Sequence, residues 1–480
     1  MKYLVSILLL ALCLFFPDSV LAQHDAANAV EHVEHAVHAL PAIWSVIPFV
    51  VLLLMIATGP LFYAHFWHKY YPHIAVFLGI VMIAYYILVI HSTGHVVHSA
   101  FEYLSFISLL TALFVASGGV LIKIDKKGTP LTNVVLLVIG AALANIVGTT
   151  GASMLLIRPF MRLNKGRIKA YHVIFFIFMV SNVGGSLTPI GDPPLFLGFL
   201  KGVPFMWTVE HVWIYWIFGI GLLSAIFFFF DSRNKEEVEG EYTGKIKVTG
   251  AKNIIFLVIT IAAVFIDPNV IDLPSFLYID YHGIKLSYLR ELIMLTTAFF
   301  AYKMSNKEAL KGNDFNFEPI LEVAFLFVGI FFTMMPALQL IAAFANSPEG
   351  AALITSDSLY WLTGSLSGVL DNAPTYMNFL SAGMGKVSLN VGQLNDVHTF
   401  VAASTVPTET SYGYLLSISV ASVFFGAMTY IGNAPNFMVK AIAEQNGLEM
   451  PAFITYIIKY SIPILLPVLF LTWLFIKFML

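Results

Sequence analysis

Long apolar segments separated by short polar stretches fill the chain from residue 43 to its end. A helix needs about 20 predominantly apolar residues to cross a bilayer. Uninterrupted segments of this kind lie at 43–65, 73–92, 95–122, 207–230, 254–266, 288–304, 318–345 and 453–478. The pattern predicts an all-α polytopic membrane protein.

Two further apolar segments, Tyr171–Leu200 and Tyr414–Ala443, are interrupted by glycine and proline. Within the first, Ser181–Pro194 contains three glycines and three prolines in fourteen residues, through which a helix cannot run unbroken. Irregular backbone at membrane depth is tolerated only where protein or a water-filled cavity surrounds it. We therefore expect two broken helices whose breaks face the interior of the protein.

The two interruptions share a motif. Thr188–Phe196 reads TPIGDPPLF and Thr429–Phe437 reads TYIGNAPNF, with the same residue at five of the nine positions. Corresponding interruptions in the two halves of a hydrophobic chain indicate a transporter's binding site. The alternative is two ordinary loops between helices, but loops would not need the same order of hydroxyl, polar and proline residues twice.

Two segments predict re-entrant hairpins. Pro130–Leu163 is too short to cross twice, yet basic residues flank it on both sides, so its polar tip at Asn145–Thr150 is expected to enter from the cytoplasm and return. Leu353–Met384, with its tip at Leu370–Thr375, is expected to enter from the opposite side. We predict two inverted repeats, each with one hairpin and one broken helix, at 43–230 and 253–480, joined by a charged cytoplasmic linker at 231–252.

The N-terminal region is read separately. Residues 1–22 resemble a signal peptide, the alternative being an uncleaved signal anchor. Residues 23–42 form a histidine-rich segment, expected in the periplasm as an exposed amphipathic helix or, alternatively, a metal-binding one. With this start, the lysines between spans fall on the cytoplasmic side, which predicts a multi-pass protein of the bacterial inner membrane with a periplasmic N-terminus.

Composition narrows the function. The chain is 59% hydrophobic and 11% charged, whereas soluble domains carry about 25% charge. The net charge of −3 does not indicate the strongly basic surface that is typical of nucleic-acid-binding proteins.

The hairpin tips and helix breaks carry oxygen-bearing side chains, the ligands that hard cations prefer. Asp192 and Asp371 are the candidate proton or cation carriers, because a carboxylate can bind either; the alternative for each is a helix cap, a stronger rival for Asp371. The candidate ion ligands beside them are Asn145, Thr149, Thr150, Ser181, Asn182, Thr188, Asn372, Thr375, Thr429 and Asn433.

Other polar residues are weaker signals. His95, His98 and Glu102 share one helix face and suggest a proton path or pH sensor, or else an interfacial polar cluster. Glu322 is a further candidate pH-sensing residue, which either lies at the boundary of its span or faces an interior cavity. We place Arg158 at the interface as an anchor of the first hairpin, which leaves Lys440 as the one basic residue expected in the core.

These motifs resemble the ion transporter superfamily, and most closely its NhaD-type sodium/proton antiporters; citrate-type transporters, arsenite permeases and the melanosomal P protein are relatives. The resemblance rests on Gly184-Gly185 with Thr188–Pro194, Leu370–Pro374, Ile431-Gly432 and Ala443–Gly447. It implies a scaffold domain and a transport domain, an elevator movement and a homodimer. At the matching positions it implies polar site residues at Asn145, Asn182, Asp192, Asp371, Asn372 and Asn433. Antiporters of this group commonly carry Asp-Asn at the first tip, where this chain has Ala144-Asn145.

The expected function is secondary active exchange of sodium or lithium for protons, with no enzymatic activity, no catalytic residue and no resident metal or cofactor; sodium is the transported or coupling ion. The alternative is a sodium-coupled carrier of citrate, a dicarboxylate or another anion. Few basic residues near the breaks favour the cation, although half-helix N-termini can bind anions unaided. An intramembrane metalloenzyme would need a pattern such as HExxH, which the sequence lacks.

Overall fold

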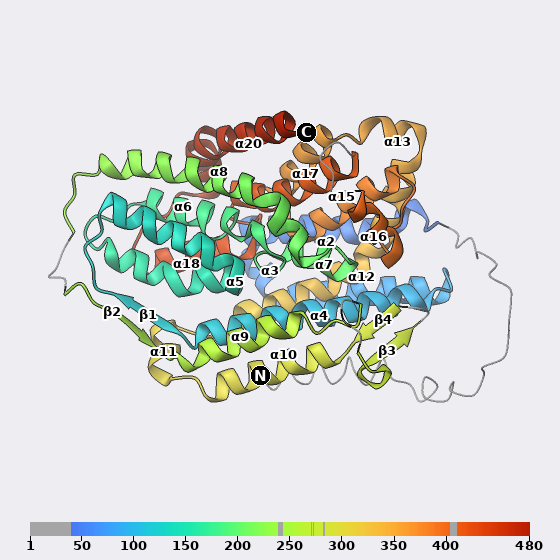
Figure 1. The fold of residues 1–480 in the computed structure, drawn as a ribbon, viewed down its shortest axis with the longest axis horizontal. Helices are drawn as coiled ribbons and strands as arrows, with labels where there is room; N and C mark the ends of the chain where they lie inside the picture. The colour runs from blue at the N-terminus through green and yellow to red at the C-terminus, as the bar shows by residue number, and fades with distance from the viewer. Residues whose placement is uncertain (1–39, 239–242, 270, 272, 282–283, 404–409) are drawn as a thin grey trace.

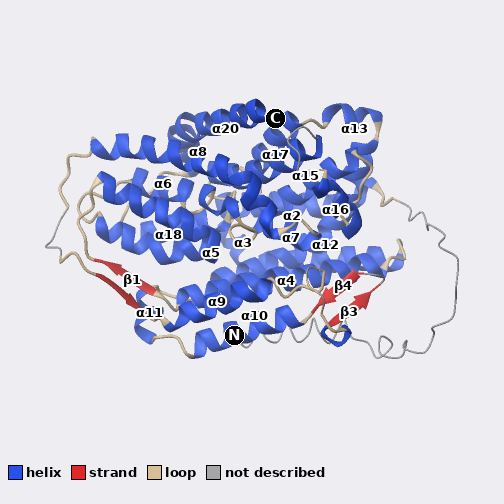
Figure 2. Ribbon diagram, in the orientation of Figure 1, coloured by secondary structure: helices blue, strands red, loops and turns tan. Residues whose placement is uncertain are grey.

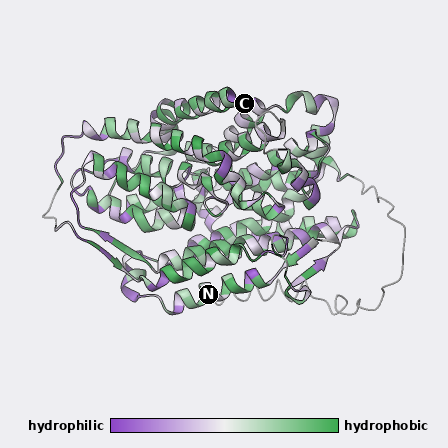
Figure 3. Ribbon diagram, in the orientation of Figure 1, coloured by the Kyte–Doolittle hydropathy of each residue, from purple (hydrophilic) through white to green (hydrophobic). Residues whose placement is uncertain are grey.

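The computed structural model describes residues 40–238, 243–269, 271, 273–281, 284–403 and 410–480. The predicted signal peptide and most of the histidine-rich segment lie outside this part of the chain. Helices run along the long axis of the molecule, with one two-stranded sheet near each end (Figures 1 and 2). Hydrophobic positions run along the helices, as Figure 3 shows.

Nine helices of the described part are long and apolar enough to cross a membrane, which confirms the predicted fold class. Shorter helices are α9 (Lys252–Val264), α10 (Leu289–Lys303), α11 (Lys307–Gly312), α13 (Pro348–Leu353) and α16 (Leu394–Ala402). The nine long ones are Ile43–Phe62 (with α2, Ile47–Phe62), α3 (Ala64–Leu88), α4 (Thr93–Gly118), α5 (Pro130–Leu163), Ala170–Leu187, α8 (Phe205–Ser232), α12 (Glu318–Asn346), Ser411–Met428 and Phe453–Met479 (with α20, Leu466–Met479).

The boundary between the first two spans differs from the prediction. We expected the second span to begin at residue 73, with Lys69 in a loop, but α3 already begins at Ala64 and includes Lys69 and Pro72. Trp67 is 1% exposed. The polar residues around it suggested a loop, but this segment is helical and packs Trp67 into the interior.

Two strand pairs were not predicted. β1 (Leu121–Ile124) connects α4 to α5, and β2 (Ile246–Thr249) connects α8 to α9; the two strands pair antiparallel, with Lys123 opposite Lys247. Part of the predicted linker is therefore a strand. β3 (Tyr278–Tyr281) and β4 (Ile284–Ser287) pair at the opposite end of the molecule (Figure 1). Basic residues gather at the β1–β2 end, so the positive-inside rule predicts that this end faces the cytoplasm.

The first predicted hairpin is present in α5. Gly148 adopts φ 77° and ψ 156°, which breaks the helix where the tip was expected. The two ends of α5 then lie together, because Gly128 N donates to Leu163 O at 2.9 Å and the side chains of Asn133 and Asn164 bond each other at 2.8 Å.

The second hairpin consists of α14 (Ser356–Ser367) and α15 (Asn372–Lys386). Its open end is closed by Lys386 Nζ, which donates to Ile354 O at 2.5 Å. This end adjoins α13, at the opposite end of the molecule from β1 (Figure 1). Hairpins that enter from opposite ends are what an inverted repeat predicts; the two-fold relation itself stays a prediction.

The two broken helices are built alike. The first consists of α6 (Ala170–Met179), η3 (Val183–Leu187) and α7 (Pro193–Lys201), and the second of α17 (Thr410–Phe424), η5 (Phe425–Met428) and α18 (Ala434–Gln445). In each break a glycine N–H donates to a threonine Oγ1 at 3.1 Å: Gly191 to Thr188, and Gly432 to Thr429. The repeated motif therefore encodes a repeated local structure.

The breaks close on themselves through paired glycines. A Cβ added to Gly191 would lie 2.1 Å from Gly185 O, and one added to Gly432 would lie 2.6 Å from Gly426 O. Because both neighbours are backbone atoms, a side chain could be accommodated only by opening the break.

We expect Gly191→Ala and Gly432→Ala each to destabilise the protein by about 1–3 kcal/mol, as overpacking does elsewhere. The control is Gly221→Ala in α8, where the added Cβ meets no atom within 4 Å and alanine improves helix propensity. Thermal unfolding of purified protein in detergent measures the effect. Equal melting temperatures for all three variants would contradict the close approach in the breaks.

Single cysteines at Gly166 and Lys247, both exposed, should react with an impermeant thiol reagent only from the cytoplasmic side. A cysteine at Glu349, exposed on α13, should react only from the other side. Labelling of intact cells against inverted vesicles measures this. Gly166 and Lys247 on opposite sides would contradict the arrangement.

Candidate functional site

Asp192 precedes the first residue of α7 and is 1% exposed. Its carboxylate accepts three hydrogen bonds: from Thr149 Oγ1 at 2.8 Å, from Asn433 Nδ2 at 2.9 Å and from Asn372 Nδ2 at 2.6 Å. The side chain does not cap its own helix. A carboxylate removed from water needs such partners, so these donors are what allow Asp192 to be buried here.

Each donor comes from a different element. Thr149 follows the break at the tip of α5, Asn372 begins α15, and Asn433 lies between η5 and α18. Together with the break before α7, these are the two hairpin tips and the two broken helices that the sequence singled out. The structure brings all four together at one carboxylate.

Asn145 and Thr188 fasten the first tip to the first break. Asn145 Oδ1 accepts from Leu187 N at 2.9 Å, and its Nδ2 donates to Gly184 O at 2.6 Å. Thr188 Oγ1 donates to Asn145 O at 2.6 Å. Both polar groups of Asn145 thus bond backbone atoms of the break, so its observed contacts are structural.

A second layer of amides joins the two broken helices. Asn182 Nδ2 donates to Asn436 Oδ1 at 2.7 Å, and Asn433 Nδ2 lies 3.1 Å from Ser181 O. Asn436 Nδ2 donates to the carbonyls of Gly426 and Thr429. Asn436 was not predicted, because the repeat aligns it with an apolar residue; its polarity in an otherwise apolar stretch was the available signal.

Asp371 has a different environment from Asp192. It caps α15, where its Oδ1 accepts from Ala373 N at 3.0 Å, and Thr375 Oγ1 donates to Asp371 O at 2.9 Å. The capping alternative considered for Asp371 therefore describes its observed contact. Asp371 also lines a cavity, whereas Asp192 does not and is enclosed by its three hydrogen-bond donors.

The cavity has a volume of about 560 Å³ and reaches from the site toward the β1–β2 end. At its inner end lie Thr149, Thr150, Asp371 and Asn433. Its outer end is lined by residues that precede or begin α12, among them Asn313, Asp314 and Glu318. Its ionisable lining residues are Arg158, Asp314, Glu318, Glu322, Asp371 and His68.

Arg158, predicted as an interfacial anchor, has a buried side chain that is 8% exposed, lines the cavity and donates to Asp314 Oδ2 at 3.2 Å. Its depth in the membrane stays a prediction. The helix after Gly148 turns this position inward, which flanking charges alone could not indicate. Lys440, by contrast, pairs with Glu444 on the exposed part of α18.

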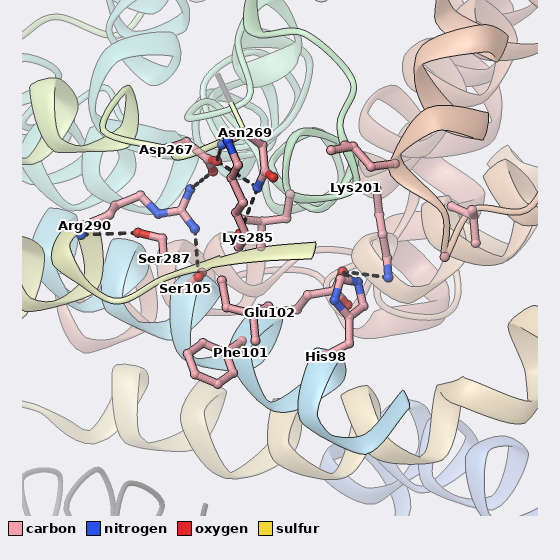
Figure 4. A pocket seen from close by; sticks show the side chains of 15 residues that line it. His98, Phe101, Glu102, Ser105, Lys201, Asp267, Asn269, Lys285, Ser287 and Arg290 are labelled. Carbon is pink, nitrogen blue, oxygen red and sulfur yellow. Dashed lines mark hydrogen bonds and ion pairs between the residues drawn. The ribbon is translucent and has the colours of Figure 1, made fainter. Parts of the chain in front are cut away.

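The proposed sensor residues lie in two places. Glu322 lines the cavity, whereas His98 and Glu102 lie in a separate cluster near β4, where Glu102 also contacts Lys201 (Figure 4). His95 bonds Ser92 Oγ at 2.7 Å. Lys201 was not considered, because nothing in the sequence relates it to Glu102.

The sequence model of a family described as "Putative citrate transport" matches residues 37–478, nearly the whole chain. No individual curated protein shows significant similarity to the chain.

We expect Asp192→Ala to destabilise the protein more than Asp371→Ala. The first change removes the acceptor of the buried donors Thr149 Oγ1 and Asn372 Nδ2, at about 1–3 kcal/mol for each unsatisfied group, while Asn433 Nδ2 keeps Ser181 O. The second removes one cap bond, worth about 1 kcal/mol. Thermal unfolding compares the two, with Asp192→Asn, which keeps the shape and one acceptor, expected to fall between wild type and Asp192→Ala. Equal losses for the two alanine variants would contradict the difference in environment.

Proposed function

Because the chain belongs to the citrate transport family just described, we propose that it is a cation-coupled secondary transporter in which Asp192 binds the cation or a proton. The observation that carries the proposal is the convergence of two hairpin tips and two helix breaks on one buried carboxylate. Our specific proposal is exchange of sodium or lithium for protons.

The chemistry of the donors suits such exchange. Thr149, Asn372 and Asn433 all point hydrogen atoms at Asp192, but each also carries an oxygen. Rotation of an amide or a hydroxyl replaces a donor by an acceptor. A sodium ion at the carboxylate would then meet oxygen ligands, the type that hard cations require. The same residues can thus hold the site in either loading state.

The charge of the cavity favours a cation. Four carboxylates line it against one arginine and one histidine, and Asp314 is already paired with Arg158. Glu318, Glu322 and Asp371 remain as excess negative charge. A cleft lined by one sign of charge concentrates ions of the other sign, so it would attract sodium and repel a trivalent anion.

A second candidate is sodium-coupled uptake of citrate or another carboxylate. The family description favours it, and a volume of about 560 Å³ falls within the range of small-molecule sites. Arg158 would supply a cationic group on the route to the site. In this case Asp192 would bind the coupling cation and the cavity the organic anion.

Under either candidate we propose alternating access by an elevator movement of a transport domain against a scaffold, in a homodimer, in the bacterial inner membrane with a periplasmic N-terminus. If the function is sodium/proton exchange, the transport cycle requires only the lipid bilayer, sodium and protons as partners.

Purified protein in liposomes decides between the candidates. An imposed pH gradient should collapse on addition of sodium and not of citrate, and labelled citrate should not accumulate when sodium is present. Liposomes without protein provide the baseline. Sodium-dependent accumulation of citrate would contradict sodium/proton exchange and support the second candidate, citrate uptake.

Asp192→Asn should abolish sodium/proton exchange in these liposomes while the protein still folds, because an amide binds no exchangeable proton. Asp371→Asn should impair exchange less, since asparagine can keep the cap. For wild-type protein, each pH unit below the titration of the carrier should weaken sodium binding about tenfold, since one proton must leave. Unchanged exchange in Asp192→Asn would place the carrier elsewhere, at Asp371 or Glu322.

A further inference from the structure

Helix α7 has a charged residue at each of its two ends. Asp192 precedes its first residue, and Lys201 is its last. Asp192 and Lys201 are nine residues apart, so their backbone positions are separated by about 14 Å along the axis of one rigid element. Whatever holds Lys201 therefore also positions the backbone next to the buried carboxylate.

Lys201 is held by an ion pair to α4. Its Nζ lies 2.6 Å from Glu102 Oε1, and the two side chains are 9% and 10% exposed. His98 Nε2, one turn away on α4, lies 3.0 Å from the same Glu102 oxygen. Figure 4 shows the lysine and the histidine reaching Glu102 from two elements, α7 and α4.

The other basic residues of this cluster have partners of their own. Arg290 on α10 binds Asp267, Glu291 and Ser105, while Lys285 on β4 lies over the ring of Tyr278. Among the charged residues that line this small cavity, Lys201 is the one that α7 contributes. The Glu102–Lys201 pair is therefore the charged contact between α7 and the group formed by α4, α10 and β4.

This pair lies at the opposite end of the molecule from the mouth of the large cavity. The cavity mouth is lined by residues 313–319, next to α11 and the β1–β2 end, whereas the cluster adjoins β4. The cavity beside the site thus opens toward one end, while the buried ion pair holds α7 against α4 at the other.

We propose that the Glu102–Lys201 pair is a latch that keeps the site open toward the β1–β2 end, and that the pair must break before the site can open toward the β3–β4 end. The inference rests on the proposed function only in assuming that the protein alternates between two orientations. A buried ion pair contributes little net stability compared with apolar packing, but it favours one arrangement of the two elements over others. Lys201 and Glu102 are positioning residues in this view, because neither contacts Asp192.

A thiol reporter beside the latch tests this. Ser105 is buried, lines the same small cavity and is close in size to cysteine. In a Cys13→Ser background, which removes the one native cysteine, Ser105→Cys should react slowly with an impermeant maleimide added at the β3–β4 side. Adding Glu102→Gln or Lys201→Gln should speed this reaction at least tenfold, because the closed arrangement loses its ion pair.

Two further variants make the result decisive. Lys123→Gln removes an exposed ion pair with Glu308 at the far end and should leave the labelling rate unchanged. Each single variant buries an unpaired group, so the double variant Glu102→Gln/Lys201→Gln, which leaves no charge, covers the case in which a single variant fails to fold. Slow labelling of a folded double variant would overturn the latch.

The measurement uses no transported ion, so it separates the two proposals. If the double variant is labelled fast but wild-type protein in liposomes does not exchange sodium for protons, the latch is retained and the exchange function is rejected. Slow labelling with active exchange would do the reverse.

Discussion

Burial of the Asp192 carboxylate is the constraint on which the centre of this structure depends. An isolated carboxylate in a protein interior is strongly unfavourable unless hydrogen-bond donors replace water. Here the three donors come from three separate elements, two of them in the second half of the chain. The halves therefore cannot separate at this point without exposing or stranding the charge. The breaks in the helices are what allow the donors to approach.

Broken helices create a second requirement, because each break leaves backbone groups without helical partners. The repeated threonines meet part of it by accepting from glycine N–H groups in the same break. Asn145 and Asn436 meet much of the remainder. Several of the polar residues that look like ion ligands in the sequence thus bond the backbone of the breaks, and they hold the geometry around Asp192.

The sequence was most informative where a feature repeats or is local. The shared motif at Thr188 and Thr429 predicted both breaks, and basic residues on both sides of residues 130–163 predicted the first hairpin. Contacts between distant segments left no such trace. β1 and β2 pair although they are more than a hundred residues apart in the sequence. Glu102 and Lys201 join two helices that no sequence pattern relates to each other.

Orientation was the other limit of sequence reasoning. Asp192 and Asp371 are the same residue type and each directly precedes a helix, yet one receives donors from three elements and the other caps its own helix. Arg158 shows the same limit: its charge suggested an interfacial position, but burial in the cavity wall follows from the direction of the helix after Gly148. Such differences depend on packing between elements, which no local pattern encodes.

The repeats are alike in backbone and unlike in charge, and electrostatics explains why. Asp192 and Asn433 precede matching half-helices with nearly the same backbone angles. Their side chains nevertheless meet, with Asn433 Nδ2 2.9 Å from Asp192 Oδ1. A second aspartate at 433 would place two carboxylates in contact, where like charges in a low-dielectric interior repel strongly, and it would also remove a donor that Asp192 needs. Two copies of one structural motif that converge on a single point can carry only one charge there, so the second copy has to supply the amide.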